Sequence, residues 1–235
     1  MSSATGHPRA VLVVSESSGP AFQELYGEPL YSHALRALVE AAGPVVVAVD
    51  GPDLPRVRTE VERWRIPAHV LTLDEHWRFL RDGPGGSLLV HDALCPLVTS
   101  DFLASMAQRS GDEPEVSFVA VRAVTDTLKA VVDGHIQKTI DRDGLAAVTS
   151  PLVVSGDVLQ ESVDERPPLD DFVAMVDWLR ERGEVQLVRA PSLGRRVEHA
   201  RSVHLLECMD EVGRRVRAEA GHQGVSQSSV PEDRP

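Results

Sequence analysis

Short continuous apolar runs alternate along the first half of the chain with segments in which apolar residues recur every three or four positions. The runs are typical of strands buried on both faces of a parallel sheet, and the wider spacing is typical of amphipathic helices. The expected strands are Ala10 to Val14, Pro44 to Val49 and Ser87 to Val90, and the expected helices are Leu30 to Ala42 and Leu54 to Arg65. This alternation predicts an α/β fold with a mostly parallel sheet and helices on both faces.

The second half continues the alternation and adds a hairpin. The further expected helices are Thr99 to Arg109, Asp170 to Arg182 and Val197 to Arg217. The further expected strands are Val116 to Val124 and Val185 to Val188. Between them, Thr127 to Val132 and Ile136 to Ile140 are β-rich runs joined by Asp133-Gly134, a specific hairpin signal. A two-stranded arm over about residues 126–142 buries little on its own, so we expect it to pack against another subunit or the body of the fold.

The polar ends of the chain, residues 1–9 and 218–235, are expected to be disordered, which leaves one domain over residues 10–217. Hydrophobic residues make up 42% and charged residues 26%, as in ordinary globular proteins. The net charge of -12 disfavours general binding to nucleic acid. Cys95 and Cys208 stand in unlike contexts, so no disulfide framework or zinc site is expected, and a reducing cytoplasm is the expected location. No signal peptide and no membrane-spanning run is recognisable in the sequence.

Residues that directly follow the buried strands are the first candidates for chemistry, because ligands gather at the carboxyl ends of parallel strands. The carboxylate of Asp92, after the strand ending at Val90, is suited to holding Mg²⁺ between protein and phosphate oxygens, but an aspartate there also often caps a turn. The loop from Ser15 to Ala21 is suited to presenting backbone N–H groups to a phosphate. It has one glycine, Gly19, and no nearby lysine or arginine, so an ordinary surface loop fits it as well.

Other polar clusters have simpler explanations. Asp141-Arg142-Asp143 matches the D-x-D metal motif of sugar-nucleotide transferases, but such triplets are also common in solvated turns. Asp170-Asp171 opens a helix, where acidic residues act as caps. The histidines show no H-E-x-x-H spacing, and Cys95, which precedes Pro96, is expected to be a buried thiol.

Several segments resemble motifs of the family of cytidylyltransferases that makes 4-diphosphocytidyl-2-C-methyl-D-erythritol in non-mevalonate isoprenoid biosynthesis. Leu88 to Val98 is similar to the V-H-D-A-A-R-P signature, Val124 to Lys129 to V-x-D-T-[IM]-K, and Thr139 to Leu145 to D-R-x-x-L. Asp170-Asp171 falls at the D-[DE]-A segment, and Gly194 to Val197 falls in G-x-x-x-N-x-K-[IV]-T. The three signatures occur in the family's order, and the resemblance covers most of the expected domain.

The resemblance implies a Rossmann-like nucleotidyltransferase fold that forms a homodimer through the arm. It implies that CTP and methylerythritol phosphate react to give the cytidylyl product and pyrophosphate. By this resemblance Ser15, Gly19 and Asp92 would bind the nucleotide, with Mg²⁺ on Asp92. Thr127 and Arg142 would bind the phosphorylated sugar alcohol, partly across the dimer, and Arg195 would replace a lysine that contacts substrate and phosphate.

The sequence departs from the family at positions that neutralise phosphate charge. The first loop lacks the family's arginine and lysine, and Ala21 stands at the lysine position. Cys95 replaces the arginine of the V-H-D-A-A-R-P signature. The family's G-G-x-x-R-x-x-S-V segment has no clear counterpart in this chain. One hypothesis is a working enzyme whose lost cations are replaced by Arg78, Arg122 or Arg196. A second is a catalytically silent relative that acts as a dimeric binding or regulatory protein. A third, a glycosyltransferase, depends only on the D-x-D triplet.

Overall fold

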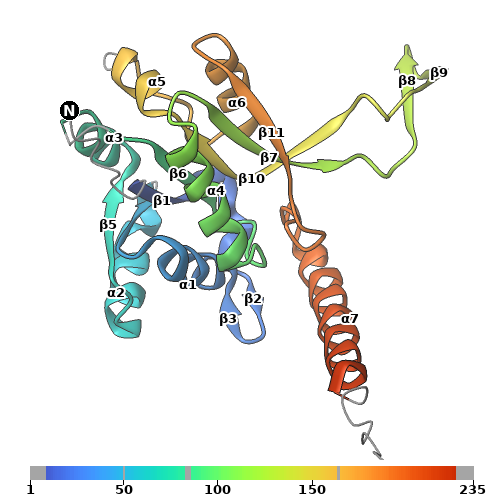
Figure 1. Ribbon diagram of the computed structural model, residues 1–235, viewed down its shortest axis with the longest axis horizontal. Helices are drawn as coiled ribbons and strands as arrows, with labels where there is room; N and C mark the ends of the chain where they lie inside the picture. Colours follow the sequence, from blue (N-terminus) through green and yellow to red (C-terminus); the bar gives the residue numbers. More distant parts are fainter. Residues whose placement is uncertain (1–8, 50, 83–85, 163–164, 226–235) are drawn as a thin grey trace, which may run out of the picture.

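The computed structural model describes residues 9–49, 51–82, 86–162 and 165–225, and a seven-stranded sheet forms its centre (Figure 1). The strand order is β11-β7-β10-β6-β1-β4-β5. Their bounds are β1 Arg9–Val14, β4 Val45–Val49, β5 Ala68–Thr72, β6 Leu88–Asp92, β7 Ser117–Ala123, β10 Ala146–Val154 and β11 Val185–Arg189. Within this sheet β10 runs antiparallel to both of its neighbours, and the other pairings are parallel. The predicted α/β fold with a mostly parallel sheet is confirmed.

Helices cover both faces of the sheet because successive residues of each buried strand point to opposite sides. On β1, Leu12 packs into one apolar cluster and Val13 into the other. The first cluster includes residues of α1 (Leu30–Ala42), α2 (Leu54–Trp64) and α4 (Ser100–Asp112). The second includes residues of α3 (Leu73–Asp82), α5 (Gly156–Glu161) and α6 (Phe172–Arg180). Apolar runs without polar alternation therefore correspond to strands enclosed between two helical layers.

Local sequence signals fix several element boundaries. The Thr99 side chain accepts a hydrogen bond from the Phe102 backbone N–H at the start of α4, and Asp171 caps α6 in the same way. Asp133 and Gly134 both have positive φ, 47° and 77°, as a tight hairpin turn requires. This turn joins β8 (Leu128–Val132) to β9 (His135–Ile140). The predicted hairpin and the predicted acidic cap of α6 are confirmed.

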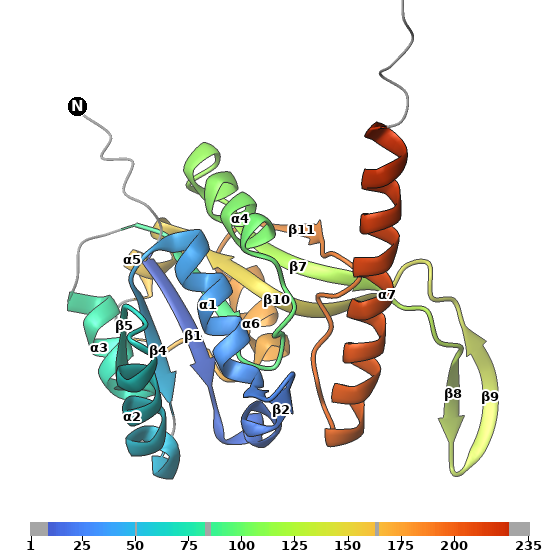
Figure 2. The same cartoon turned by 90° about the horizontal axis from the view of Figure 1, so that it is seen from below.

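The β8–β9 arm projects away from the body of the molecule in both views (Figures 1 and 2). It is a separate two-stranded sheet. Its large aliphatic side chains are exposed to solvent: Val131 57%, Val132 56%, Ile136 69% and Ile140 36%. The arm therefore does not pack on the body of its own chain.

The C-terminal helix α7 (Ala200–Val225) packs against a small hairpin that follows the first loop. The hairpin consists of β2 (Glu24–Leu25) and β3 (Glu28–Pro29). Its Leu25 shares a buried cluster with Val203 and Leu206, and the Tyr26 hydroxyl donates to the Asp210 carboxylate at 3.1 Å. Helix α7 extends beyond the predicted domain end at 217, so residues 218–225 are helical where a disordered tail was predicted. Residues 1–8 and 226–235 of the predicted tails lie outside the described residues.

No helix in the described ranges is both long enough and apolar enough to cross a bilayer.

Candidate functional site

A cavity of about 370 Å³ lies at the carboxyl end of β7. The start of β10, the segment 195–198 and the first turns of α7 form its other walls. Because β10 is antiparallel, its first residues lie at the same edge of the sheet as the last residues of β7. This is the edge at which open α/β sheets bind ligands.

Three arginines line this cavity: Arg122 at the end of β7, and Arg195 and Arg196 before α7. Burial lowers the pKa of Arg122, and the positive charge of Arg195 lowers it further. Two guanidinium groups are thus close enough to repel each other. Asp126 and Glu198 also line the cavity, but among the described residues neither forms an ion pair with Arg122 or Arg195. The arrangement favours a bound anion.

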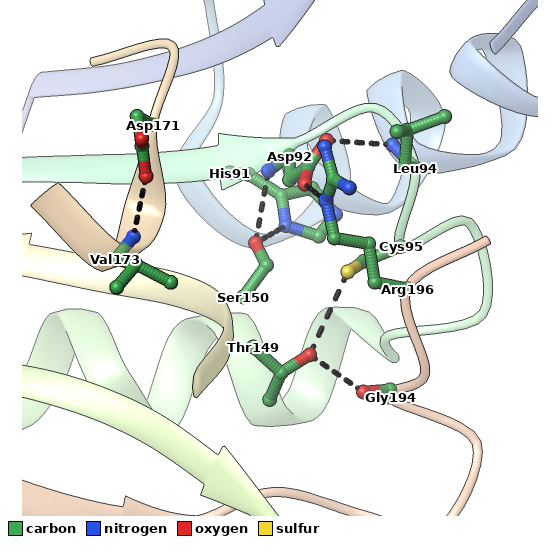
Figure 3. Close-up of polar contacts among 10 residues, drawn as sticks. All are labelled: His91, Asp92, Leu94, Cys95, Thr149, Ser150, Asp171, Val173, Gly194 and Arg196. Atoms are coloured by element: carbon green, nitrogen blue, oxygen red, sulfur yellow. Dashed lines mark hydrogen bonds and ion pairs between the residues drawn. The ribbon is translucent and has the colours of Figure 1, made fainter. Parts of the chain in front are cut away.

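Arg196 forms an ion pair with Asp92, the last residue of β6 (Figure 3). The Arg196 Nε donates to Asp92 Oδ2 at 2.7 Å, and the Leu94 backbone N–H donates to Asp92 Oδ1 at 2.9 Å. The Asp92 side chain is 5% exposed and that of Arg196 is 35% exposed. Burial by itself lowers the pKa of Arg196, but Asp92 offsets this and the net shift is upward. The guanidinium is therefore a permanent cation on the carboxylate.

His91 and Ser150 hold the backbone of this strand end in place. The Asp92 backbone N–H donates to Ser150 Oγ at 2.9 Å, and Ser150 Oγ lies 2.6 Å from His91 Nδ1. Because the hydroxyl oxygen already accepts from Asp92, its proton is available for Nδ1, which fits a neutral imidazole. Burial lowers the pKa of His91 to about 3.

The segment that carries Arg195 and Arg196 is fixed from both ends. Thr149 Oγ1 donates to the Gly194 carbonyl at 2.7 Å, and the Val197 backbone N–H donates to the Leu94 carbonyl at 2.8 Å. Cys95, whose Sγ lies 3.6 Å from Thr149 Oγ1, is fully buried. The predicted buried thiol is confirmed; burial and then the charge of Asp92 raise the pKa of Cys95 to about 12, so it stays protonated at neutral pH.

The surroundings of Asp92 do not fit a resident Mg²⁺. Magnesium sites in nucleotide enzymes use one or two carboxylates with substrate phosphates and waters. Here one carboxylate is present, both of its oxygens accept hydrogen bonds, and a guanidinium occupies the cation position. Across residues 9–49, 51–82, 86–162 and 165–225, no group of three or more acidic, histidine or cysteine side chains is arranged to hold a metal ion. The magnesium expectation stays untested, and these contacts argue against it.

Ser15 and Gly19 of the first loop are not among the residues that line the arginine cavity. Residues Glu16–Phe22 form a 3-10 helix, within which Ala21 is fully buried in the apolar cluster below α1. Ser15 is buried after β1, and Gly19 has open space around it. Neither predicted position therefore lines the cavity, although the loop begins beside the Asp92–Arg196 pair, because Val13 of β1 is the neighbour of Asp92 in the sheet.

Thr127 and Arg142 lie at the base of the arm. The Arg142 guanidinium donates to the Thr125 carbonyl, and Thr125 lines the cavity. Thr127 is exposed, and neither Thr127 nor Arg142 lines the cavity of its own chain. In the D-x-D triplet, the Asp143 backbone N–H donates to Asp141 Oδ1 at 3.1 Å, which is a local turn.

Sequence reasoning chose Arg195 as the family's basic residue, but the structure pairs Asp92 with Arg196. The signal was present in the motif spacing, because the lysine of K-[IV]-T directly precedes the aliphatic residue and Arg196 directly precedes Val197. Arg195 lines the same cavity, with its guanidinium 3.8 Å from Met209 Sδ. Of the proposed replacement cations, Arg122 and Arg196 line the cavity and Arg78 does not.

Comparison with known proteins identifies relatives that include cytidylyltransferases. Residues 81–189 match the family model of 2-C-methyl-D-erythritol 4-phosphate cytidylyltransferase. An enzyme of that name from Aquifex aeolicus is 26% identical over 140 residues, which is 60% of this chain and 64% of the relative. One from Saccharopolyspora erythraea is 30% identical over 151 residues, 58% of this chain and 66% of the relative. The match thus spans just under two thirds of each of these relatives.

Solved structures of such enzymes share the fold. The 4-diphosphocytidyl-2C-methyl-D-erythritol synthase from Anaerococcus prevotii has a TM-score of 0.66 at 10% identity, covering 89% of this chain and all of that chain (100%). The 2-C-methyl-D-erythritol 4-phosphate cytidylyltransferase from Thermus thermophilus has a TM-score of 0.64 at 21% identity, covering 86% of this chain and 98% of that chain. At such low identities, the likeness supports the Rossmann-like nucleotidyltransferase fold alone.

Proposed function

We propose that this chain, a divergent member of the 2-C-methyl-D-erythritol 4-phosphate cytidylyltransferase family, binds a small sugar-alcohol phosphate and does not transfer a cytidylyl group. The observation that carries the proposal is the distribution of positive charge. Arg122, Arg195 and Arg196 line one cavity at the base of the arm, whereas the first loop has no lysine or arginine.

The half of the site that would hold a triphosphate lacks the groups its chemistry requires. Nucleotidyl transfer depends on cations and N–H donors that neutralise charge developing on the phosphates. Removing one such group typically costs about 2.7–4 kcal/mol of transition-state stabilisation, or 10²–10³ in rate. The first loop lacks two of the family's cations, and the arginine position of the V-H-D-A-A-R-P signature holds the buried Cys95. Together, these losses would lower the reaction rate too far for a useful cytidylyltransferase activity.

Calorimetric titration with 2-C-methyl-D-erythritol 4-phosphate tests the binding. We expect a saturable site that weakens by about 10- to 150-fold in Arg195→Gln and in Arg122→Gln, since each variant removes one charge-assisted contact of about 1.5–3 kcal/mol. Arg180→Gln is the matched control, because Arg180 ends α6 and lies outside the cavity. Absence of saturable binding, or equal weakening by the control, would overturn the proposal.

A second candidate is a working cytidylyltransferase, and one observation favours it. Two of the replacement cations suggested by the sequence, Arg122 and Arg196, do reach one cavity. In this case CTP and the sugar-alcohol phosphate together should release pyrophosphate, with Mg²⁺ present. A coupled pyrophosphate assay separates the candidates: sustained release supports the enzyme, and binding of the sugar-alcohol phosphate without release supports the silent protein.

The family resemblance also leads us to propose a homodimer joined through the β8–β9 arm. Four aliphatic side chains of the arm are exposed in the single chain: Val131, Val132, Ile136 and Ile140. A partner subunit would cover this apolar surface. Thr127 and Arg142, at the base of the arm, would then face the partner's site rather than the cavity of their own chain.

A further inference from the structure

The Asp92 carboxylate already faces a cation, although it is the residue for which the family resemblance implies Mg²⁺. Arg196 Nε is 2.7 Å from Oδ2, and Oδ1 accepts the Leu94 N–H. A metal ion at Asp92 would have to share one carboxylate with the guanidinium, which places two cations side by side. Magnesium also gives up its water ligands reluctantly, which disfavours binding there.

The different exposure of Arg196 and Asp92 also disfavours a metal ion at Asp92. Arg196 lines the cavity, whereas the Asp92 side chain is almost fully buried. A ligand that enters the cavity therefore meets Arg196 first. Figure 3 shows the guanidinium lying against the carboxylate, with its Nε used for the ion pair.

We propose that Arg196 takes the place of a divalent cation at Asp92, so that the cavity binds a phosphate group as the free anion, without Mg²⁺. Asp92 holds the guanidinium through Nε, which leaves the two terminal nitrogens to donate to phosphate oxygens in the planar geometry that arginine favours. Arg122 and Arg195 add two further cations in the same cavity. This inference relies on the proposed function for the ligand's identity, but its phosphate chemistry depends only on the arginines.

Acidic groups around the cavity offset this charge only in part. Asp126 and Glu198 also line the cavity and are exposed, so water and salt weaken their effect, although the charge of Glu198 does act on Arg196. Asp92 neutralises Arg196 formally, but it accepts through one edge of the guanidinium only. Burial lowers the pKa of Arg122 and the charge of Arg195 lowers it further, in keeping with the place of both guanidinium groups in the lining of the cavity.

The first test uses the metal alone. Titration of the protein with Mn²⁺, followed by electron paramagnetic resonance, should show no site that Asp92→Asn removes. A Mn²⁺ site that this substitution abolishes would overturn the inference, whichever substrate the protein uses.

The second test titrates inorganic phosphate into the protein by calorimetry, once in EDTA and once in millimolar Mg²⁺. We expect dissociation constants that agree within about twofold, since no metal takes part. Binding that requires Mg²⁺ would overturn the inference. Failure of 2-C-methyl-D-erythritol 4-phosphate to bind more tightly than inorganic phosphate would instead overturn the proposed function and leave the metal-free site intact.

Two variants test the role of Arg196 itself. Arg196→Lys keeps the charge that neutralises Asp92 but loses the planar donors, and it should weaken phosphate binding several-fold in EDTA. The double variant Asp92→Asn/Arg196→Gln removes both charges together, so it remains testable if Arg196→Gln alone fails to fold. It should weaken phosphate binding about tenfold, the loss of one charge-assisted contact. Unchanged phosphate binding in folded protein of both variants would overturn the role of Arg196.

Discussion

At the scale of single residues, the stability of the strand end depends on the pairing of Asp92 with Arg196. Arg196→Gln leaves a buried carboxylate without its cation, and breaking a fully buried pair in this way costs about 3–5 kcal/mol. Because the Arg196 side chain is 35% exposed, water compensates in part, and we expect a loss of about 1–3 kcal/mol. Urea denaturation, monitored by circular dichroism, measures this difference.

The control for this prediction is the double-mutant cycle. Asp92→Asn/Arg196→Gln removes both charges and keeps groups of similar shape, so it should be more stable than Arg196→Gln alone. If the single and double variants are equally destabilised, the two side chains do not depend on each other.

Two buried histidines make stability depend on pH. Burial lowers the pKa of His91 from 6.5 to about 3; burial and then the charge of Arg9 lower that of His76 to about 4. Both side chains are neutral in the folded protein and protonate more readily in the unfolded chain. Their contribution to the free energy of unfolding is therefore fully present above pH 6.5, and it is lost as the pH falls toward about 4 for His76 and about 3 for His91. The slope approaches about 1.4 kcal/mol per pH unit for each group. The urea midpoint should fall between about pH 7 and about pH 5, and it should fall less steeply in the His76→Met variant. An equal slope in this variant would contradict the role of His76.

At the scale of elements, the arm determines the oligomeric state that we propose. Deleting Asp133 to Gln137 removes the turn and the most exposed aliphatic residue, Ile136. The β8–β9 arm makes its contacts away from the core, so the domain should fold while the mass in solution shifts from dimer to monomer. Sedimentation equilibrium measures this, and a mass per particle that remains that of a dimer would reject the role of the arm. Arg180→Gln, a change on α6 away from the arm, is the control and should leave the dimer intact.

Elements with a continuous local signal could be predicted, and interrupted ones could not. The buried strands β1, β4 and β6 are unbroken aliphatic runs, so their pattern reflects burial on two faces. Strand β10 was not predicted because Thr149-Ser150-Pro151 breaks its apolar pattern. In the structure those polar residues bond with His91, Asp92 and Gly194, contacts that lie 45 or more positions away.

At the scale of the whole molecule, the site depends on contacts between distant segments. The sequence indicated Asp92 from its place after a strand, but the guanidinium that pairs with it comes from 104 positions further along the chain. Arg122 reaches the same cavity because β7 and β10 are neighbours in the sheet. The strand order follows from tertiary packing, so local patterns could suggest these arginines as candidates but could not place them together.

The packing of the first loop predicts that family residues restored by substitution will not create an enzyme. Ala21→Lys and Cys95→Arg return two of the family's cations, but Ala21 and Cys95 are fully buried in the same apolar cluster. A cation placed there must lose its hydration or force the core open, so we expect each variant to lose more than about 2 kcal/mol of stability. Neither variant, alone or combined, should release pyrophosphate from CTP and 2-C-methyl-D-erythritol 4-phosphate.

Gly19→Lys separates the burial effect from the charge effect. Gly19 is exposed in the same 3-10 helix, a Cβ added there would meet no atom within 4 Å, and its φ is not positive. Lysine at this position should therefore change stability by less than about 0.5 kcal/mol. It adds a cation to the loop without placing it at the family's arginine or lysine position, and it too should give no pyrophosphate. Urea midpoints and the coupled assay are read on the same preparations.

Sustained pyrophosphate release from the double variant Ala21→Lys/Cys95→Arg would show that the loop can open from its packed conformation. This result would restore the cytidylyltransferase candidate.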